Sequence, residues 1–198
     1  LELDGPVIAE NGTVMRLPGE EPSGFSPDYT TIRRLLNELR ETDPEFRFTG
    51  FGDMTVDQVV AATGLTAESA SLAMQRLASE PVLWQGSAQA LERFKYRLRE
   101  IGLHSLQGGR FLHLMGDMDK GRAVKRLIDW YKTKGWQNIT SLALGDSGND
   151  KDMLLSVDIP VIIRKPHGSH LDLPQRKDAI ITAAPRPRGW NQAVHPLL

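Results

Sequence analysis

The sequence has 198 residues, of which 40% are hydrophobic, so it is long enough to bury a core as one domain or as two small ones. Its formal net charge of −1 gives no basic surplus for nucleic acid, and the absence of cysteine excludes disulfides, thiolate catalysis and thiolate metal sites. No apolar run approaches the roughly 18 residues of a membrane span, and the first residues show no secretion signal, so we expect a cytoplasmic protein with a small-molecule partner and an undetermined oligomeric state.

The first residues predict a β-hairpin. Val7–Ala9 and Thr13–Arg16 are short apolar segments, and Asn11-Gly12 between them is a strong turn signal because both residues tolerate a positive φ. Leu17–Pro27 is rich in proline and glycine, which predicts a linker to a second domain.

The segment from residue 23 to residue 114 predicts an α+β domain. Capping residues and apolar spacing define its elements, and Leu77 is expected on the inward face of the third helix. In chain order, the predicted elements are a helix after Asp28, a strand with Phe46, Phe48 and Phe51, the helix Val56–Ala62, a helix after Thr66, the strand Val82–Trp84, the helix Ala88–Ile101, and the strands Leu103–Gln107 and Arg110–Leu114.

The segment GGRFLH at residues 108–113 joins the last two of these strands and is the chemical candidate of the domain. Arginine offers a planar fork that fits a carboxylate or a phosphate, and histidine adds a donor. The alternative is a hairpin with an exposed arginine and a half-buried histidine. Strict alternation would place Arg110 and His113 on opposite faces, so joint contact with a ligand needs a bend or a bulge.

A lysine begins the next helix. Asp119 can cap the predicted helix Lys120–Lys132, and Lys120 stands in its first turn, where the helix dipole disfavours a cation. A bound phosphate would reverse this penalty, because backbone N–H groups and the ammonium would then converge on one anion. A solvated surface lysine is the alternative interpretation.

The loop GDSGND at residues 145–150 follows the apolar segment Thr140–Leu144, which predicts a buried strand. In an open parallel sheet, ligands bind beyond the carboxyl ends of the strands, so two carboxylates at this point predict a site for a hard cation such as Mg²⁺ rather than Zn²⁺. The alternative is that these residues serve as an ordinary turn and helix cap.

The remaining residues predict two further strands and a closing helix. Arg164-Lys165 lies at the end of the first of these strands, where exposed loop charge competes with a substrate contact as the interpretation. His167 and His170 lack a third ligand for a metal site. The predicted elements are the strand Ile159–Ile163, the edge strand Ala179–Thr182 and the helix Trp190–Val194.

Four motifs carry a resemblance to a known family. GDSGND resembles the fourth motif of the haloacid dehalogenase-like phosphohydrolases, and DKG-x-A at residues 119–123 resembles their third motif. ENG at residues 10–12, which alone indicates only a turn, resembles a hairpin that borders their active site. With GGRF-x-H, the order of these motifs is similar to that of the mannosyl-3-phosphoglycerate phosphatase family over nearly all of the chain.

The resemblance implies an α/β fold with a Rossmann-like parallel-sheet core, incomplete at its N-terminus, and an inserted α+β cap. Residues 1–22 and 115–198 would form the core, and residues 23–114 the cap that recognises substrate. The implied reaction is Mg²⁺-dependent removal of the 3-phosphate of mannosyl-3-phosphoglycerate, or its glucosyl analogue, through an aspartyl-phosphate.

The same resemblance assigns roles to individual residues. The implied catalytic residues are Lys120, Asp146, Asn149 and Asp150, of which Asp146 and Asp150 hold the metal. The implied substrate-binding residues are Glu10, Asn11, Arg110, His113 and again Lys120.

The family's nucleophile is the first aspartate of Asp-x-Asp-Gly-Thr, and the start of this chain departs from that motif. Glu2-Leu3-Asp4-Gly5 has glutamate at the first position and is followed by proline, with no apolar strand before it. We therefore expect the sequence to begin inside a longer protein, after roughly 40 to 50 residues of a βαβ unit, and to be inactive alone. The alternatives are a related sugar-phosphate phosphatase and a non-catalytic Mg²⁺-binding remnant.

Overall fold

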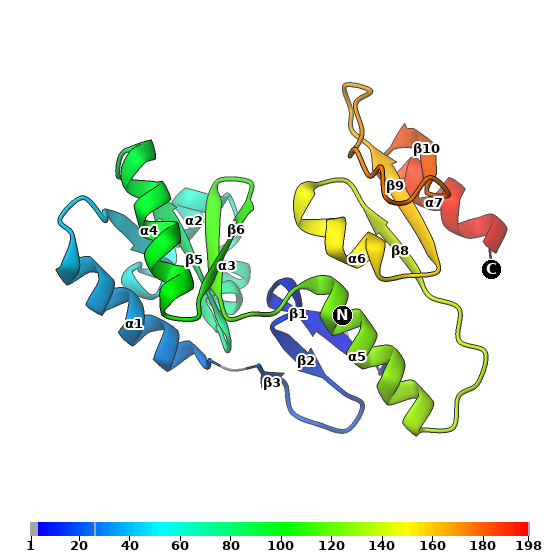
Figure 1. Cartoon of the computed structure of the whole chain (residues 1–198), viewed down its shortest axis with the longest axis horizontal. Helices are drawn as coiled ribbons and strands as arrows, with labels where there is room; N and C mark the ends of the chain where they lie inside the picture. Colours follow the sequence, from blue (N-terminus) through cyan, green and yellow to red (C-terminus); the bar gives the residue numbers. More distant parts are fainter. Residues whose placement is uncertain (1–3, 26, 198) are drawn as a thin grey trace. The chain divides into compact units, whose positions relative to one another are not determined.

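A computed structural model describes residues 4–25 and 27–197 (Figure 1). The chain forms two compact units, Leu1–Met118 and Asp119–Leu198. Glu2 and Leu3, which belong to the departure from the nucleophile motif, lie outside the described residues. The predicted grouping of residues 1–22 with residues 115–198 stays a prediction.

The first unit begins with the predicted hairpin. β1 (Val7–Ala9) pairs antiparallel with β2 (Val14–Arg16), which confirms it, although the connection is a 3₁₀ turn, η1 (Glu10–Gly12), rather than a two-residue loop. β3 (Ser23–Gly24) pairs with β2. The segment predicted as a linker, residues 17–27, therefore contains a short strand that extends the hairpin.

The α+β order predicted for the rest of the first unit is confirmed. Its strands form an antiparallel sheet in the order β4-β5-β7-β6, and α1 and α4 pack on one face of it around Phe94 and Leu98 (Figure 1). The elements are α1 (Tyr29–Thr42), β4 (Phe48–Gly50), η2 (Phe51–Asp53), α2 (Val56–Thr63), α3 (Ala67–Met74), β5 (Ser79–Trp84), α4 (Ala88–Glu100), β6 (His104–Gly108) and β7 (Phe111–Met115).

Local sequence signals correctly predict where these helices start, but they fail to predict where the strand β4 and the helix α3 end. Asp28 and Thr55 accept hydrogen bonds from the third residue of their helices, as the capping patterns predict. Phe51 opens a 3₁₀ turn instead of continuing the strand. Leu77 is 41% exposed beyond the end of α3, so its predicted inward position is wrong.

The second unit holds the predicted parallel sheet. Its strands lie in the order β10-β9-β8, and both neighbouring pairs are parallel. The carboxyl ends of all three strands therefore meet at one edge. The elements are α5 (Lys120–Thr133), β8 (Leu142–Gly145), η3 (Gly148–Asp150), α6 (Lys151–Leu155), β9 (Ile159–Arg164), β10 (Ile180–Pro185), α7 (Arg188–Val194) and η4 (His195–Leu197). In the part of the chain that the structure describes, no helix is long and apolar enough to cross a membrane.

Candidate functional site at the carboxyl edge of the parallel sheet

The loop after β8 is closed by one aspartate. Asp150 Oδ2 accepts hydrogen bonds from the backbone N–H groups of Asp146 and Ser147, each over 3.2 Å, and from Ser147 Oγ over 2.8 Å. The side chain of Asp150 is 12% exposed. Asp150 therefore fixes the backbone path of the loop and, with it, the direction in which the Asp146 side chain projects.

The second oxygen of Asp150 binds the lysine that begins α5. Lys120 Nζ lies 2.6 Å from Asp150 Oδ1, and the lysine side chain keeps 25% of its surface exposed. Burial by itself raises the pKa of Asp150, but the hydrogen bonds from Lys120 and Ser147 outweigh it, so the pKa lies below its ordinary value. The structure thus brings the two predicted residues together as an ion pair.

Asp146 meets a cation that the sequence interpretation missed. Arg186 Nη2 donates to Asp146 Oδ2 over 3.0 Å, and the Asp146 side chain is 26% exposed. Arg186 follows β10, and the signal that would have found it is an arginine directly after a strand of the same parallel sheet. Asn149, also predicted in this loop, accepts a hydrogen bond from Ser147 Oγ.

The donor set of the loop fits a hard cation in part. Of the two oxygens of the Asp146 carboxylate, only Oδ2 has a hydrogen-bond partner among the described residues. Mg²⁺ is commonly held by one or two carboxylates together with waters. Both oxygens of Asp150 already accept from protein donors. No group of three or more His, Cys, Asp or Glu side chains that could hold a metal occurs in the described part of the chain. Asp146 is therefore the loop residue best suited to bind Mg²⁺.

The other cation predicted at this edge has a structural role. The Arg164 guanidinium donates to the carbonyl oxygens of Gly168 over 2.6 Å and of Thr182 over 3.1 Å. These contacts tie the end of β9 to the following loop and to β10. His167 and His170 belong to no group of three or more His, Cys, Asp or Glu side chains among the residues described.

In the first unit, the Glu10 carboxylate accepts hydrogen bonds from several protein groups. It accepts from the N–H groups of Leu77 (2.8 Å) and Ala78 (3.2 Å) and from Ser79 Oγ (2.7 Å). Arg76 Nη2 lies 3.4 Å from it, and the Glu10 side chain is 7% exposed. Glu10 thus fastens the hairpin turn to the start of β5.

Asn11, the next residue, lies within that fastened turn. Glu10, Asn11 and Gly12 have φ values of 49°, 57° and 102°, so three consecutive residues occupy the left-handed region. Two of the three are not glycine, and such a backbone persists only where surrounding contacts fix it. The Glu10 carboxylate provides those contacts.

The GGRF-x-H segment forms the predicted hairpin, displaced by one residue. A Cβ on Gly108 would lie 2.8 Å from Nε2 and Cδ2 of His113, so the glycine leaves room for the imidazole. Arg110 is exposed in the turn, and His113 is half-buried on β7. Both belong to the turn end of one hairpin, and their joint contact with a ligand stays a prediction.

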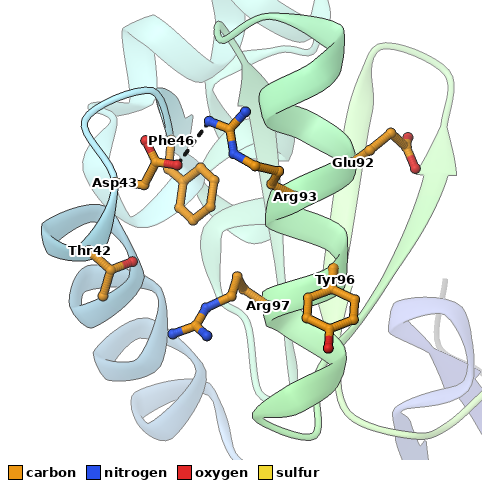
Figure 2. A pocket seen from close by; sticks show the side chains of 7 residues that line it. All are labelled: Thr42, Asp43, Phe46, Glu92, Arg93, Tyr96 and Arg97. Atoms are coloured by element: carbon orange, nitrogen blue, oxygen red, sulfur yellow. Dashed lines mark hydrogen bonds and ion pairs between the residues drawn. The ribbon is translucent and has the colours of Figure 1, made fainter.

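A cavity of about 480 Å³ lies between α1 and α4 and contains none of the predicted site residues (Figure 2). Its charged side chains are engaged with other charged groups: Arg93 pairs with Asp43 over 3.0 Å, and Arg97 pairs with Glu100 over 2.8 Å. The cavity therefore offers chiefly apolar surface, including Phe46, and no convergent polar groups of the kind that bind a phosphorylated ligand.

Comparison with known proteins supplies the family context. No family model matches the chain. A glucosyl-3-phosphoglycerate/mannosyl-3-phosphoglycerate phosphatase of Methanococcoides burtonii is 34% identical over 216 residues, covering 100% of this chain and 78% of that protein.

Solved structures show the fold. A haloacid dehalogenase-like hydrolase from Bacteroides thetaiotaomicron matches with a TM-score of 0.66 and 18% identity, over 100% of this chain and 78% of that one. A haloacid dehalogenase-like hydrolase from B. subtilis matches with a TM-score of 0.62 and 18% identity, over 99% and 80%. The predicted fold class is confirmed.

Proposed function

This chain belongs to the family of glucosyl-3-phosphoglycerate/mannosyl-3-phosphoglycerate phosphatases, and from that premise we propose that it acts in removing the 3-phosphate from a glycosyl-3-phosphoglycerate. The reaction cleaves the phosphomonoester with water and yields the glycosylglycerate and phosphate. The observation that carries the proposal is the 2.6 Å contact of Lys120 with Asp150, within the loop that also presents Asp146. A cation and an accessible carboxylate at one sheet edge fit the charge stabilisation and metal binding that phosphoryl transfer needs.

Lys120 stabilises negative charge on the phosphoryl oxygens. Its ammonium is fixed by Asp150, so it need not reorganise during the reaction, and fixed charges of this kind contribute most to catalysis in sites shielded from water. Asp150 acts as a positioning residue, because it holds both Lys120 and the backbone of the loop. Its predicted second role as a metal ligand stays a prediction.

Asp146 is the residue of this chain that would hold Mg²⁺. When bound, the metal offsets charge between the phosphate and the attacking group. Asn149 accepts a hydrogen bond from Ser147, the residue after Asp146, and thereby orients the loop next to Asp146.

The nucleophile is not assigned to any of the 198 residues, because the sequence contains no Asp-x-Asp-Gly-Thr motif. The proposed mechanism uses such an aspartate to attack phosphorus, with release of the glycosylglycerate alkoxide, and water then cleaves the aspartyl-phosphate. Turnover is therefore to be measured in a form of the protein that carries such an aspartate.

The α+β segment, residues 23–114, serves as the cap that recognises the part of the substrate distant from the phosphate. Arg110 is exposed and offers a guanidinium fork to the glycerate carboxylate, while His113 offers a donor to the sugar. Asn11 contacts substrate from the hairpin turn, and Glu10 contributes by fixing that turn.

A substrate panel tests the proposal. The full-length protein would be assayed for phosphate release with Mg²⁺ and then with excess EDTA, on mannosyl- and glucosyl-3-phosphoglycerate, 3-phosphoglycerate and a hexose phosphate. We expect Mg²⁺-dependent turnover that requires both the hexose and the glycerate carboxylate. Equal turnover of a hexose phosphate would instead identify a related sugar-phosphate phosphatase.

A further inference from the structure

The bend after β10 directs an arginine to the GDSGND loop. Arg186 lies 3.0 Å from Asp146, while its own side chain remains 68% exposed. β8 and β10 flank β9 in the parallel sheet, and neighbouring strands are about 4.8 Å apart. Arg186 therefore reaches across the end of β9 to meet the Asp146 carboxylate.

Close packing defines the backbone of this bend. The Thr182 side chain is buried, accepts from the Arg164 N–H over 3.0 Å and donates to the Ala184 carbonyl over 2.8 Å. The pairing of β10 with β9 shifts register in this stretch, as at a β-bulge. A Cβ on Gly189 would lie 1.9 Å from the Ala184 oxygen, so only glycine fits where α7 begins. Arg186 thus projects from a segment whose path is set by its contacts.

The other two cations of this edge have different partners. Arg164 is committed to main-chain carbonyl oxygens, and Lys120 is bound to the largely buried Asp150. Arg186 instead pairs with the more exposed carboxylate, the one assigned to Mg²⁺. Exposed ion pairs are weak, so a divalent cation can displace the guanidinium at little cost.

We propose that Arg186 is a substrate-binding residue that exchanges partners, holding Asp146 until a divalent cation binds there and then binding an oxyanion of the substrate. The inference rests on the proposed function. A guanidinium presents two parallel N–H donors that match phosphoryl or carboxylate oxygens, and the displaced group is already beside the metal site. Its charge also adds to that of Lys120, so the phosphoryl group would meet two cations.

Calorimetric binding to the full-length protein tests the exchange, with Mn²⁺ alone and then with inorganic phosphate or glycerate added in the presence of Mg²⁺. In Arg186→Ala we expect Mn²⁺ to bind about two- to fivefold more tightly, because a competing cation is gone. We expect the affinity for phosphate or for glycerate to fall about tenfold or more, because a charged hydrogen bond is lost. The anion that loses affinity identifies which oxygens Arg186 binds. Arg186→Lys, which keeps the charge without the fork, should give intermediate values.

Arg188→Ala is the matched control, since Arg188 is exposed and lies two residues further on, and we expect it to change neither affinity. Unchanged affinity for both anions in Arg186→Ala would overturn the proposal, and so would weaker Mn²⁺ binding with a lowered thermal midpoint, which marks a structural role. If the wild type hydrolyses neither glycosyl-3-phosphoglycerate but Arg186→Ala still changes the affinity for Mn²⁺ and the affinity for an anion, the proposed substrate is wrong and the proposed exchange of partners is supported.

Discussion

The GDSGND loop of the second unit and the Glu10 turn of the first both pair carboxylates with cations, but they differ in access to solvent. Asp146 is 26% exposed and its arginine partner is 68% exposed, whereas Glu10 is 7% exposed and receives four protein contacts. A carboxylate with one exposed partner can exchange it for a ligand, and a saturated buried carboxylate cannot without a large loss. We infer that the first kind of pair binds ligands and the second holds the fold.

A second cluster in the first unit supports this distinction. Glu80 is completely buried, and its Oε1 accepts from Arg33 and from the Gly52 N–H, each over 2.9 Å. Burial raises the pKa of Glu80. Arg33 also pairs with Asp53. This network joins α1, η2 and β5, and its carboxylates are held by several protein donors each, because Asp53 also pairs with Arg40 and accepts a hydrogen bond from the Gly50 N–H.

The largest expected effect lies at the predicted phosphoryl site. Lys120→Met in the full-length protein should lower kcat/KM by about 10²- to 10³-fold, because the charge on the phosphoryl oxygens loses its fixed partner. Steady-state phosphate release measures it. Lys132→Met, which removes a 62% exposed lysine of the same helix, should change the rate little. A loss of less than threefold in Lys120→Met would remove that lysine from the mechanism.

The next effect is on stability and concerns the Glu10 turn. Arg76→Met should lower the free energy of unfolding by about 3 kcal/mol, because a nearly buried carboxylate loses its cationic partner. Urea unfolding of the first unit would measure this loss. Arg47→Met, at an exposed position, serves as control. Equal stability of the two variants would mean that the turn does not depend on this pair.

A smaller effect is a pH dependence of the GDSGND loop. The folded-state pKa of Asp150 is depressed, so its stabilising contribution is present above the unfolded value of about 3.9 and is lost as the pH falls through the lower folded value. The amide resonances of Asp146 and Ser147, which donate to Asp150, should shift together only below about pH 3.9. Asp150→Asn should abolish that transition; a shared midpoint above pH 3.9 would contradict the depressed pKa.

The smallest effect tests the hairpin of the α+β segment. Gly108→Ala should displace the His113 ring and raise the KM for a glycosyl-3-phosphoglycerate about fivefold, a cost of about 1 kcal/mol. Gly5→Ala, where a Cβ would meet nothing within 4 Å, is the control. If KM stays the same while the His113 resonances move, His113 does not contact substrate.

Much of the local structure could be predicted because its causes are local. Asp28, Thr55 and Asp119 cap helices with hydrogen bonds to residues three positions away, and apolar runs define the parallel strands β8 and β9. The loop GDSGND could be placed at the end of a strand for the same reason.

The partners of the charged groups could not be predicted, because they come from distant parts of the chain. Glu10 binds residues 67 to 69 positions away, and Arg186 meets Asp146 across 40 positions. Nothing in the residues adjacent to Arg164 or Arg186 indicates that the first would bind carbonyl oxygens and the second a carboxylate. The tertiary path of β10 decides it.

The most direct test compares Asp146→Asn with Glu10→Gln in the full-length protein, measuring kcat/KM and thermal midpoint for each. We predict that Asp146→Asn loses at least about 100-fold in rate with a nearly unchanged midpoint, and that Glu10→Gln lowers the midpoint while retaining most of the rate below it. The reverse pattern, an active Asp146→Asn beside a stable but inactive Glu10→Gln, would contradict the assignment of ligand binding to one cluster and of structural support to the other.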